Sequence, residues 1–178
     1  MTRSSFFEIR KRLLNNIDMP LHNIEPLFNE DSRILILGSF PSVKSRETKF
    51  FYGYPQNRFW KIIATIYGEE VPQTIAAKKE LILNNHLALW DVIESCEIEG
   101  SSDSSIRNVK VNDIDKILKK SRIEKICVNG KTAEKLYCRY LEKKLDRKAI
   151  YLPSSSPANA AYSLDDLVKI WKEVLRTI

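Results

Sequence analysis

Apolar residues occur along the chain in two patterns, short unbroken runs and longer stretches with helical spacing. Four runs predict buried parallel strands, because a strand covered on both faces is apolar at nearly every position. These runs are 33–37, 87–90, 124–128 and 148–152. Apolar residues that recur every three or four positions predict helices around and between them. The helices expected are 57–67, 72–84, 112–120, 132–145 and 163–175.

The alternation of strands with helices predicts an α/β fold. Right-handed crossovers would make the strands parallel and place helices on both faces, giving a three-layer sandwich with a central four-stranded parallel sheet flanked by helices. Small, polar and proline-rich residues follow the carboxyl ends of the strands: Gly38–Ser42, Asp91, Asn129–Lys131 and Pro153–Pro157. Open sheets of this kind bind ligands at that edge. We therefore expect a functional site there.

The other segments are predicted to surround this core. Ser5 and Glu8 have the spacing of a capping box, which predicts a helix over 5–14. Residues 19–30 contain two prolines and indicate an extended linker, and residues 97–108 show no period and indicate a surface loop. We expect a single domain over residues 1–178, in which 1–31 is an accessory N-terminal helix and linker.

An aromatic segment, Phe50–Trp60, follows the first predicted strand. It holds six aromatic residues between glycine and proline punctuation. Aromatic side chains exposed in such a loop would suit base stacking. The alternative is a loop that tucks its rings under itself and closes the edge of the sheet. The pattern alone leaves both interpretations open.

Composition is that of a soluble globular protein, with 43% hydrophobic and 29% charged residues among 178. No apolar run approaches the ~18 residues of a membrane span, and no signal peptide opens the chain, so we expect a cytoplasmic protein. Cys96, Cys127 and Cys138 are odd in number and widely spaced, which argues against disulfides and against a metal site. Cys127 and Cys138 lie in predicted elements and are expected to be buried thiols.

The net charge of +6 is unevenly distributed. Residues 33–61 hold six Lys/Arg and one Glu, and residues 107–148 hold fourteen Lys/Arg and six acids, whereas residues 62–106 hold two basic and eight acidic residues. A basic surface attracts a polyanion such as DNA. The alternative is a solvated lysine-rich face without a partner.

Three motifs carry a resemblance to a known family: Gly38-Ser-Phe-Pro-Ser42, Tyr52-Gly-Tyr-Pro-Gln-Asn-Arg-Phe-Trp-Lys61 and Leu152-Pro-Ser-Ser-Ser-Pro-Ala-Asn159. In this order and spacing they resemble the uracil-DNA glycosylase superfamily, and most of all its hypoxanthine-DNA (deoxyinosine) glycosylase branch, over about residues 32–175. The resemblance implies a monofunctional DNA glycosylase of base excision repair. Its substrate would be double-stranded DNA containing a deaminated base, and hypoxanthine would be released from deoxyinosine. We expect a monomer without a cofactor or metal ion.

The resemblance also implies the site residues. Asn57 matches the branch's catalytic asparagine, and its amide is expected both to donate to a water and to accept from it. The alternative role for Asn57 is a helix N-cap. The implied base pocket is formed by Gly38, Ser39, Phe40, Pro41, Ser42, Phe51 and Tyr52. The implied DNA-binding residues are Lys44, Arg46, Arg58, Lys131, Ser154, Ser155, Ser156, Pro157, Ala158 and Asn159.

Within these sets, some roles remain open. Phe40, Phe51 and Tyr52 compete as the stacking partner of a flipped base, with Tyr52 preferred, and the backbone amides of Ser39 and Phe40 are candidates for neutralising a base oxygen. The loop 156–162 resembles the loop that enters the minor groove. Its plug would be Ala160, Ala161 or Tyr162.

The chain departs from the superfamily at two positions. Phe40 replaces the usual Asp or Asn of the first turn, and Ser155-Ser156-Pro157 stands where uracil enzymes have His before Ser-Pro. His22 and His86 are expected to be structural or exposed. Asp91 either orients a water or caps a turn, and Lys131 is a candidate for contacting a phosphate at a helix N-terminus.

These departures keep two other functions open. One is a uracil (G:U/T mismatch) DNA glycosylase, because the same turn and aromatic loop can hold either oxo-base. The other is a non-catalytic α/β module that binds nucleic acid or a small phosphate ligand.

Overall fold

The computed structural model describes residues 20–177, and a four-stranded parallel sheet forms their centre. The helix expected over 5–14 lies outside the described residues. The strands are β1 (Ile34–Gly38), β2 (Leu87–Asp91), β5 (Lys125–Asn129) and β6 (Ile150–Leu152), in the order β2-β1-β5-β6. All neighbours in this sheet are parallel. The predicted α/β fold class is confirmed.

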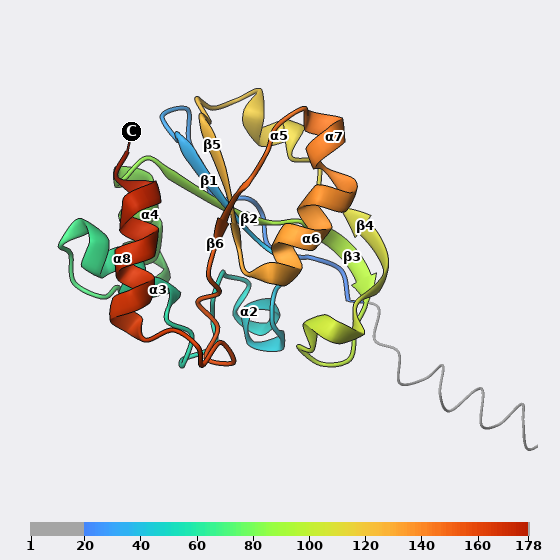
Figure 1. Ribbon diagram of the computed structural model, residues 1–178, viewed down its shortest axis with the longest axis horizontal. Helices are drawn as coiled ribbons and strands as arrows, with labels where there is room; N and C mark the ends of the chain where they lie inside the picture. Colours follow the sequence, from blue (N-terminus) through green and yellow to red (C-terminus); the bar gives the residue numbers. More distant parts are fainter. Residues whose placement is uncertain (1–19, 178) are drawn as a thin grey trace, which may run out of the picture.

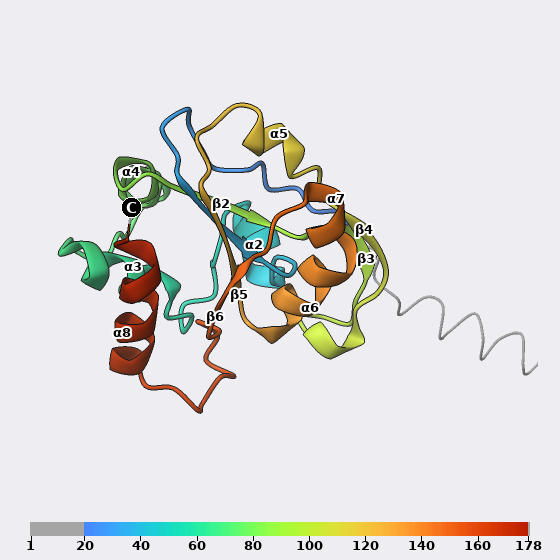
Figure 2. The same cartoon turned by 45° about the horizontal axis from the view of Figure 1, so that its top comes forward.

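Helices cover both faces of the sheet (Figures 1 and 2). One face carries α3 (Phe59–Tyr67), α4 (Ile75–Asn84) and α8 (Leu164–Leu175), and the other carries α6 (Lys131–Tyr140) and α7 (Glu142–Leu145) with α5 (Asp115–Leu118) beside them. Every residue of β1 and β2 is buried as a result. This double burial explains why the strands appear in the sequence as unbroken apolar runs.

The helix boundaries follow their capping residues. Gly68 ends α3 in the left-handed conformation, and Ser163 with Asp166 forms a capping box on α8. Both caps lie at ends of the helices expected over 57–67 and 163–175. Thr74, and not Pro72, caps α4. The helix expected over 132–145 is divided at Leu141 into α6 and α7.

The prediction that residues 97–108 form a surface loop is wrong at both ends of that segment. β3 (Ile93–Glu97) and β4 (Arg107–Val111) pair as a small antiparallel sheet, and a 3-10 turn, η1 (Asp103–Ser105), lies in their connection. Register shifts interrupt the pairing. The apolar alternation that identifies a strand is therefore broken, and the sequence pattern missed both strands.

The segment 39–58 between β1 and α3, called the motif loop below, contains another missed element. This element is the helix α2 (Val43–Thr48). The Ser42 side chain caps it by accepting a hydrogen bond from the Ser45 N–H at 3.2 Å. Ser45 is its one buried residue. A helix that buries so little has no apolar stripe for a pattern to detect.

The segment 20–31 is more than the linker that the prolines indicated. Ile24 and Leu27 are buried, and Leu27 pairs with Leu89 of β2 in an antiparallel bridge. The Trp90 indole donates to the Ile24 carbonyl at 3.1 Å. Because β2 is the last strand on its side of the sheet, the segment 20–31 covers an otherwise open edge.

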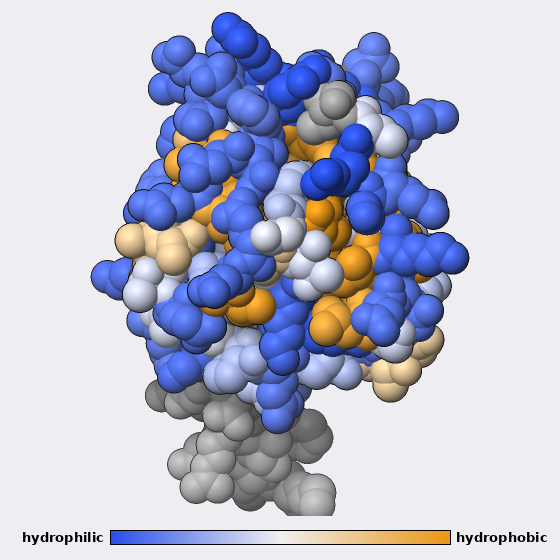
Figure 3. Space-filling model, turned by 90° about the vertical axis from the view of Figure 1, so that its left-hand side faces the viewer, coloured by the Kyte–Doolittle hydropathy of each residue, from blue (hydrophilic) through white to orange (hydrophobic). Residues whose placement is uncertain are grey.

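The surface is mostly polar. On the face turned toward α3, α4 and α8, hydrophilic residues predominate and apolar ones show between them (Figure 3). Among the described residues, no helix is both long and apolar enough to cross a membrane. Cys96 and Cys127 are buried, but Cys138 is exposed, so the prediction that Cys138 is buried was wrong.

Candidate active site

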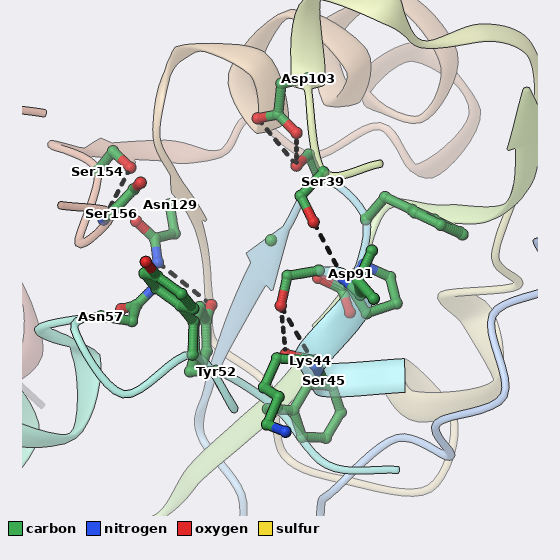
Figure 4. A pocket seen from close by; sticks show the side chains of 18 of the residues that line it. Ser39, Lys44, Ser45, Tyr52, Asn57, Asp91, Asp103, Asn129, Ser154 and Ser156 are labelled. Atoms are coloured by element: carbon green, nitrogen blue, oxygen red, sulfur yellow. Dashed lines mark hydrogen bonds between the residues drawn. The ribbon is translucent and has the colours of Figure 1, made fainter. Parts of the chain in front are cut away.

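A cavity of about 510 Å³ opens at the carboxyl edge of the parallel sheet (Figure 4). Its size is within the ~300–1,000 Å³ typical of small-ligand pockets. The structure brings Asn57 together with every residue of the expected base pocket around this cavity: Gly38, Ser39, Phe40, Pro41, Ser42, Phe51 and Tyr52. Four residues expected to bind DNA also line it, namely Lys44, Ser154, Ser156 and Pro157.

The aromatic segment 50–60 lies mostly inside the protein. Phe50 and Phe51 are buried, as are Phe59 and Trp60 at the start of α3. Tyr54 is the exception, with 46% of its surface exposed. The interpretation that the loop tucks its rings under itself therefore holds for most of the segment, because its rings extend the core toward the cavity.

Tyr52 connects this aromatic core to the cavity. Its ring stacks on Phe59 with centroids 3.8 Å apart, so one of its two faces is covered. Its backbone has φ of 51°, a left-handed conformation that costs an ordinary residue about 1–2 kcal/mol. Burial, reinforced by the negative charge of Asp91, raises the pKa of the phenol above its ordinary value. Tyr52 thus remains protonated at neutral pH and keeps an O–H donor beside the cavity.

The side chain of Asn57 is held by a hydrogen-bond network. Its Oδ1 accepts from the Phe59 N–H at 3.0 Å and from the Ser155 hydroxyl at 2.9 Å. Ser155 in turn accepts from Asn129 Nδ2 at 2.9 Å, and the same amide nitrogen donates to the Tyr52 hydroxyl at 3.2 Å. Figure 4 shows Asn57, Tyr52 and Asn129 gathered on one part of the wall.

This network determines which end of the Asn57 amide is available. A rotated amide would turn its NH₂ group against the Phe59 N–H, so the orientation with Oδ1 toward Phe59 is the compatible one. Both lone pairs of Oδ1 are then occupied, and the free group is the Nδ2 donor. The expectation that the amide would also accept from a water is therefore wrong. The helix-cap interpretation of Asn57 is correct in part, since it accepts from the first turn of α3 although Arg58 occupies the cap position.

A carboxylate lies at the floor of the cavity, where β1 and β2 end side by side. Gly38 pairs with Asp91, and a Cβ added to Gly38 would lie 2.3 Å from Asp91 Oδ1. Glycine is therefore required for this carboxylate to occupy its place. Among residues 20–177, no hydrogen bond reaches Asp91 Oδ1, so this atom is an available acceptor at the cavity.

His22 holds the other oxygen of Asp91. The imidazole Nδ1 accepts from the Ile24 N–H at 3.2 Å, which leaves the proton on Nε2, and Nε2 lies 2.8 Å from Asp91 Oδ2. The side chains of His22 and Asp91 are 1% and 8% exposed. His22 is structural, as expected, but it supports a carboxylate of the cavity, which its position in a proline-rich segment did not indicate.

A second carboxylate at the cavity belongs to Asp103 in η1, and it contacts Ser39 in the turn after β1. The Ser39 hydroxyl donates to its two oxygens at 3.1 and 3.3 Å. Partial desolvation beside the cavity raises the pKa of Asp103, and the Ser39 hydrogen bond opposes this rise. No sequence pattern indicated Asp103, because it lies in a segment rich in Ser, Gly and Asp without a period.

Several residues expected to bind DNA have other roles. Ser155 is 1% exposed and is part of the Asn57 network, so its side chain is not available to DNA. The Arg58 guanidinium donates to carbonyls of the 155–162 loop, so the expected contact with DNA is replaced by an intramolecular one. Arg46 extends over the Phe40 ring, with its guanidinium carbon 5.4 Å from the ring centroid. Lys131 pairs with Glu134 at 3.0 Å.

The basic stretch 107–148 does not gather around the cavity as a whole. α6 begins at the cavity edge of the sheet, whereas α5 and α7 lie at the opposite edge (Figure 1). The lysines of α5 and α7 are thus far from the motif loop. Of the remaining residues expected to contact DNA, Ala158 is exposed and Asn159 is partly exposed.

No group of three or more His, Cys, Asp or Glu side chains among residues 20–177 is arranged to hold a metal ion. The side chains that line the cavity include amides, hydroxyls, the Lys44 amine and the carboxylates of Glu47, Asp91 and Asp103. Such a set can stabilise charge on a bound group and position a water, and its aromatic wall can contact a planar ring.

Comparisons with known proteins show which proteins this chain is similar to. The family model described as the uracil DNA glycosylase superfamily matches residues 25–175. A Methanosarcina acetivorans protein named hypoxanthine DNA glycosylase is 35% identical over 155 residues, covering 84% of this chain and 94% of that protein. A Methanosarcina barkeri protein of the same name is 32% identical over 116 residues, covering 64% of this chain and 73% of that protein.

One solved structure extends this agreement to three dimensions. It is a solution NMR structure of a protein from Methanosarcina acetivorans that is described as a candidate uracil DNA glycosylase. It shares 32% sequence identity and superposes with a TM-score of 0.74, covering 86% of this chain and 94% of that chain.

Proposed function

The chain belongs to the uracil-DNA glycosylase superfamily, and on that premise we propose that it is a monofunctional DNA glycosylase of base excision repair. It hydrolyses the N-glycosidic bond of deoxyinosine in DNA and releases hypoxanthine. The observation that carries this proposal is the fixed amide of Asn57 at the wall of a base-sized cavity. The name shared by the two Methanosarcina relatives supports the choice of base.

The cavity offers the groups that this reaction needs. Cleavage of the bond passes through an oxocarbenium-like sugar, while negative charge develops on the departing base. The Asn57 Nδ2 donor and the protonated Tyr52 hydroxyl can stabilise that charge. Asp91 Oδ1 is an acceptor for a proton of the attacking water or for an N–H of the base. The C1′–N9 bond breaks and the water oxygen bonds to C1′. One water proton passes to Asp91 Oδ1 and then to the departing base, which gives an abasic site and neutral hypoxanthine.

Hypoxanthine and adenine differ in the edge that they present. Hypoxanthine has a carbonyl at position 6 and an N1–H, whereas adenine has an amino group and an unprotonated N1. A donor that pairs with the carbonyl would face another donor in adenine, a mismatch that costs about 1–3 kcal/mol at a buried site. We therefore expect hypoxanthine to be released fastest and adenine not at all. We expect uracil to be released slowly or not at all, because Phe40 and Ser155-Ser156-Pro157 stand where uracil enzymes have an Asp or Asn and a His.

Uracil release is the second candidate, because the solved relative is described as a candidate uracil DNA glycosylase. Uracil carries the same carbonyl and N–H pair. Because the hydrogen-bonding edge is the same, the shape of the cavity would have to separate the two bases.

A base-release assay on matched duplexes tests the proposal. End-labelled duplexes carry hypoxanthine, uracil or a normal base at one position, and alkali reveals abasic sites under single-turnover conditions. We expect alkali-dependent cleavage at hypoxanthine and no cleavage without alkali, since no Schiff-base lysine is proposed. Equal rates on uracil and hypoxanthine would overturn the base preference alone. Absence of release from every duplex, together with salt-sensitive DNA binding, would favour the non-catalytic module.

We also propose that this activity resides in a single domain that acts as a monomer in the cytoplasm. Size-exclusion chromatography with light scattering tests the monomer, and a dimer whose dissociation abolishes base release would contradict it.

A further inference from the structure

Arg58 makes an unusual set of contacts with the loop that follows β6. Its Nη1 donates to the Tyr162 carbonyl at 2.5 Å, and its Nη2 donates to the carbonyls of Ser156 and Asn159 at 2.7 and 2.9 Å. Nε donates to the Ser155 carbonyl at 3.3 Å, and the backbone N–H of Arg58 reaches the same oxygen at 3.1 Å. One side chain thus binds the loop at both ends and in its middle.

Apart from Arg58, the loop is anchored at its C-terminal end by Tyr162, which is partly buried against the core. Pro157, Ala158, Ala160 and Ala161 are exposed. Its other hydrogen bonds are short-range, such as the one from the Asn159 amide to the Ser154 carbonyl at 2.9 Å. Without the guanidinium, a loop of this kind would sample many backbone conformations. Ordering it would then cost roughly 1–2 kcal/mol of conformational entropy per residue.

The loop lies beside the mouth of the cavity. Ser156 and Pro157 line the cavity, and the loop runs next to the segment that leads into α3 in both ribbon views (Figures 1 and 2). Its exposed residues are small and mostly apolar, which suits entry into the space that a flipped nucleotide leaves in a base stack.

From these observations we propose that Arg58 is a positioning residue that pre-organises the 156–162 loop as a wedge for duplex DNA. This inference rests on the proposed glycosylase function. Arg58 fixes the wedge before DNA binds, so the ordering cost is not deducted from the binding free energy. The planar guanidinium offers five donors in a fixed fork, which a lysine cannot reproduce.

An alternative is that Arg58 acts only by supporting its neighbour Asn57, because Ser155 contacts both residues. The two roles differ in their dependence on DNA structure. A wedge matters only where a base must leave a stack, whereas a displaced Asn57 slows the chemistry in every substrate.

The test compares Arg58→Lys with the wild-type chain on deoxyinosine in a duplex and in a single strand of the same sequence. We expect the single-turnover rate to fall about 10- to 100-fold on the duplex and less than about 3-fold on the single strand. Arg139→Lys, on an exposed arginine of α6, is the matched control and should leave both rates unchanged. Equal losses on the two substrates, or no loss on either, would overturn the wedge proposal.

Two further measurements keep the proposal separate from folding and from the function itself. Hydrogen exchange of amides in 154–162 should quicken in Arg58→Lys while the exchange of β1 and β5 amides stays unchanged, and unchanged loop exchange would refute the clamp. The double variant Ala160→Gly with Ala161→Gly leaves the clamp intact and should reproduce the duplex-selective loss. A wild-type chain that releases no base from either substrate would refute the glycosylase proposal, whereas the exchange result would still report on the clamp.

Discussion

At the floor of the cavity, β1 and β2 end side by side within strands whose residues are all buried. At its mouth, the 156–162 loop exposes small residues and is held largely by one guanidinium. The floor is therefore a continuation of the hydrophobic core, and the mouth is an exposed loop attached to it mainly by hydrogen bonds. Substitutions at the floor should change stability and activity together, whereas those at the mouth should change activity on duplex DNA with little effect on folding.

The largest expected effect is that of Asn57→Ala, which sits between the two regions. Removal of the fixed donor should slow base release by about 10²–10³-fold on duplex and single strand alike. The lost acceptor for the Phe59 N–H should cost about 1 kcal/mol, so the protein should still fold. Single-turnover kinetics and thermal unfolding measure both quantities. An unchanged rate in a folded variant would remove Asn57 from the mechanism and direct attention to Asp91.

Gly38→Ala tests the floor. The new Cβ would lie 2.3 Å from Asp91 Oδ1, so the carboxylate or the strand must move. We expect about 1–3 kcal/mol of lost stability together with reduced base release. Ala158→Ser, in the exposed loop, is the counterpart at the mouth and should change the free energy of unfolding by less than about 0.5 kcal/mol. Urea unfolding of both variants checks this difference. Equal losses of stability would contradict the claim that the floor, and not the mouth, contributes to folding.

The same difference explains how far the sequence could predict this protein. Double burial makes β1 and β2 apolar at every position, so their pattern is sufficient to find them. The capping box at Ser163 is likewise local, and it lies where the helix over 163–175 was expected to begin. β3 and β4 were missed because their pairing is irregular, and α2 was missed because it buries only Ser45. These elements depend on contacts that no local pattern records.

The site was also predicted only as far as local motifs indicate it. The motif resemblance pointed to Asn57 and to the turn after β1, and the structure brings these together at one cavity. It did not reveal that Ser155 and Asn129 determine the orientation of the Asn57 amide, because the three residues are far apart in the chain. The role of Arg58 was misassigned for a related reason. A basic residue in a DNA-binding motif suggests a phosphate contact, whereas here its partners are backbone carbonyls, which have no sequence signature.

A smaller effect is expected from the charges at the mouth of the cavity. Lys44 lines the cavity and pairs with Glu47 at 3.2 Å on the surface. If Lys44 neutralises a phosphate, Lys44→Ala should reduce the slope of log K against log salt by about one on an undamaged duplex. Lys143→Ala, in α7 at the opposite edge, is the control and should leave the slope unchanged. Equal slopes for Lys44→Ala and the wild-type chain would exclude Lys44 from the DNA contacts.

The smallest expected effect concerns Asp103, which joins the floor to the connection between β3 and β4. Its pKa is raised in the folded protein, so the folded state binds the Asp103 proton more tightly than the unfolded state does. Ionisation of Asp103 therefore lowers the free energy of unfolding. This loss is absent below the ordinary pKa of an aspartate, grows as pH rises toward the raised pKa and is complete above it. Asp103→Asn should remove this loss and keep an acceptor for the Ser39 hydroxyl.

Asp103→Asn should consequently be more stable than the wild-type chain at pH 7, and this advantage should vanish at acid pH. We expect the gain to stay below about 1 kcal/mol, because solvent reaches the other side of the carboxyl and screens its charge. Asp113→Asn, on an exposed aspartate away from the cavity, reports the general effect of losing a carboxylate. Urea unfolding at several pH values provides the measurement. A variant that is less stable than the wild-type chain at pH 7 would show that the Ser39 hydrogen bond outweighs desolvation, and would reverse the assigned cause of the pKa shift.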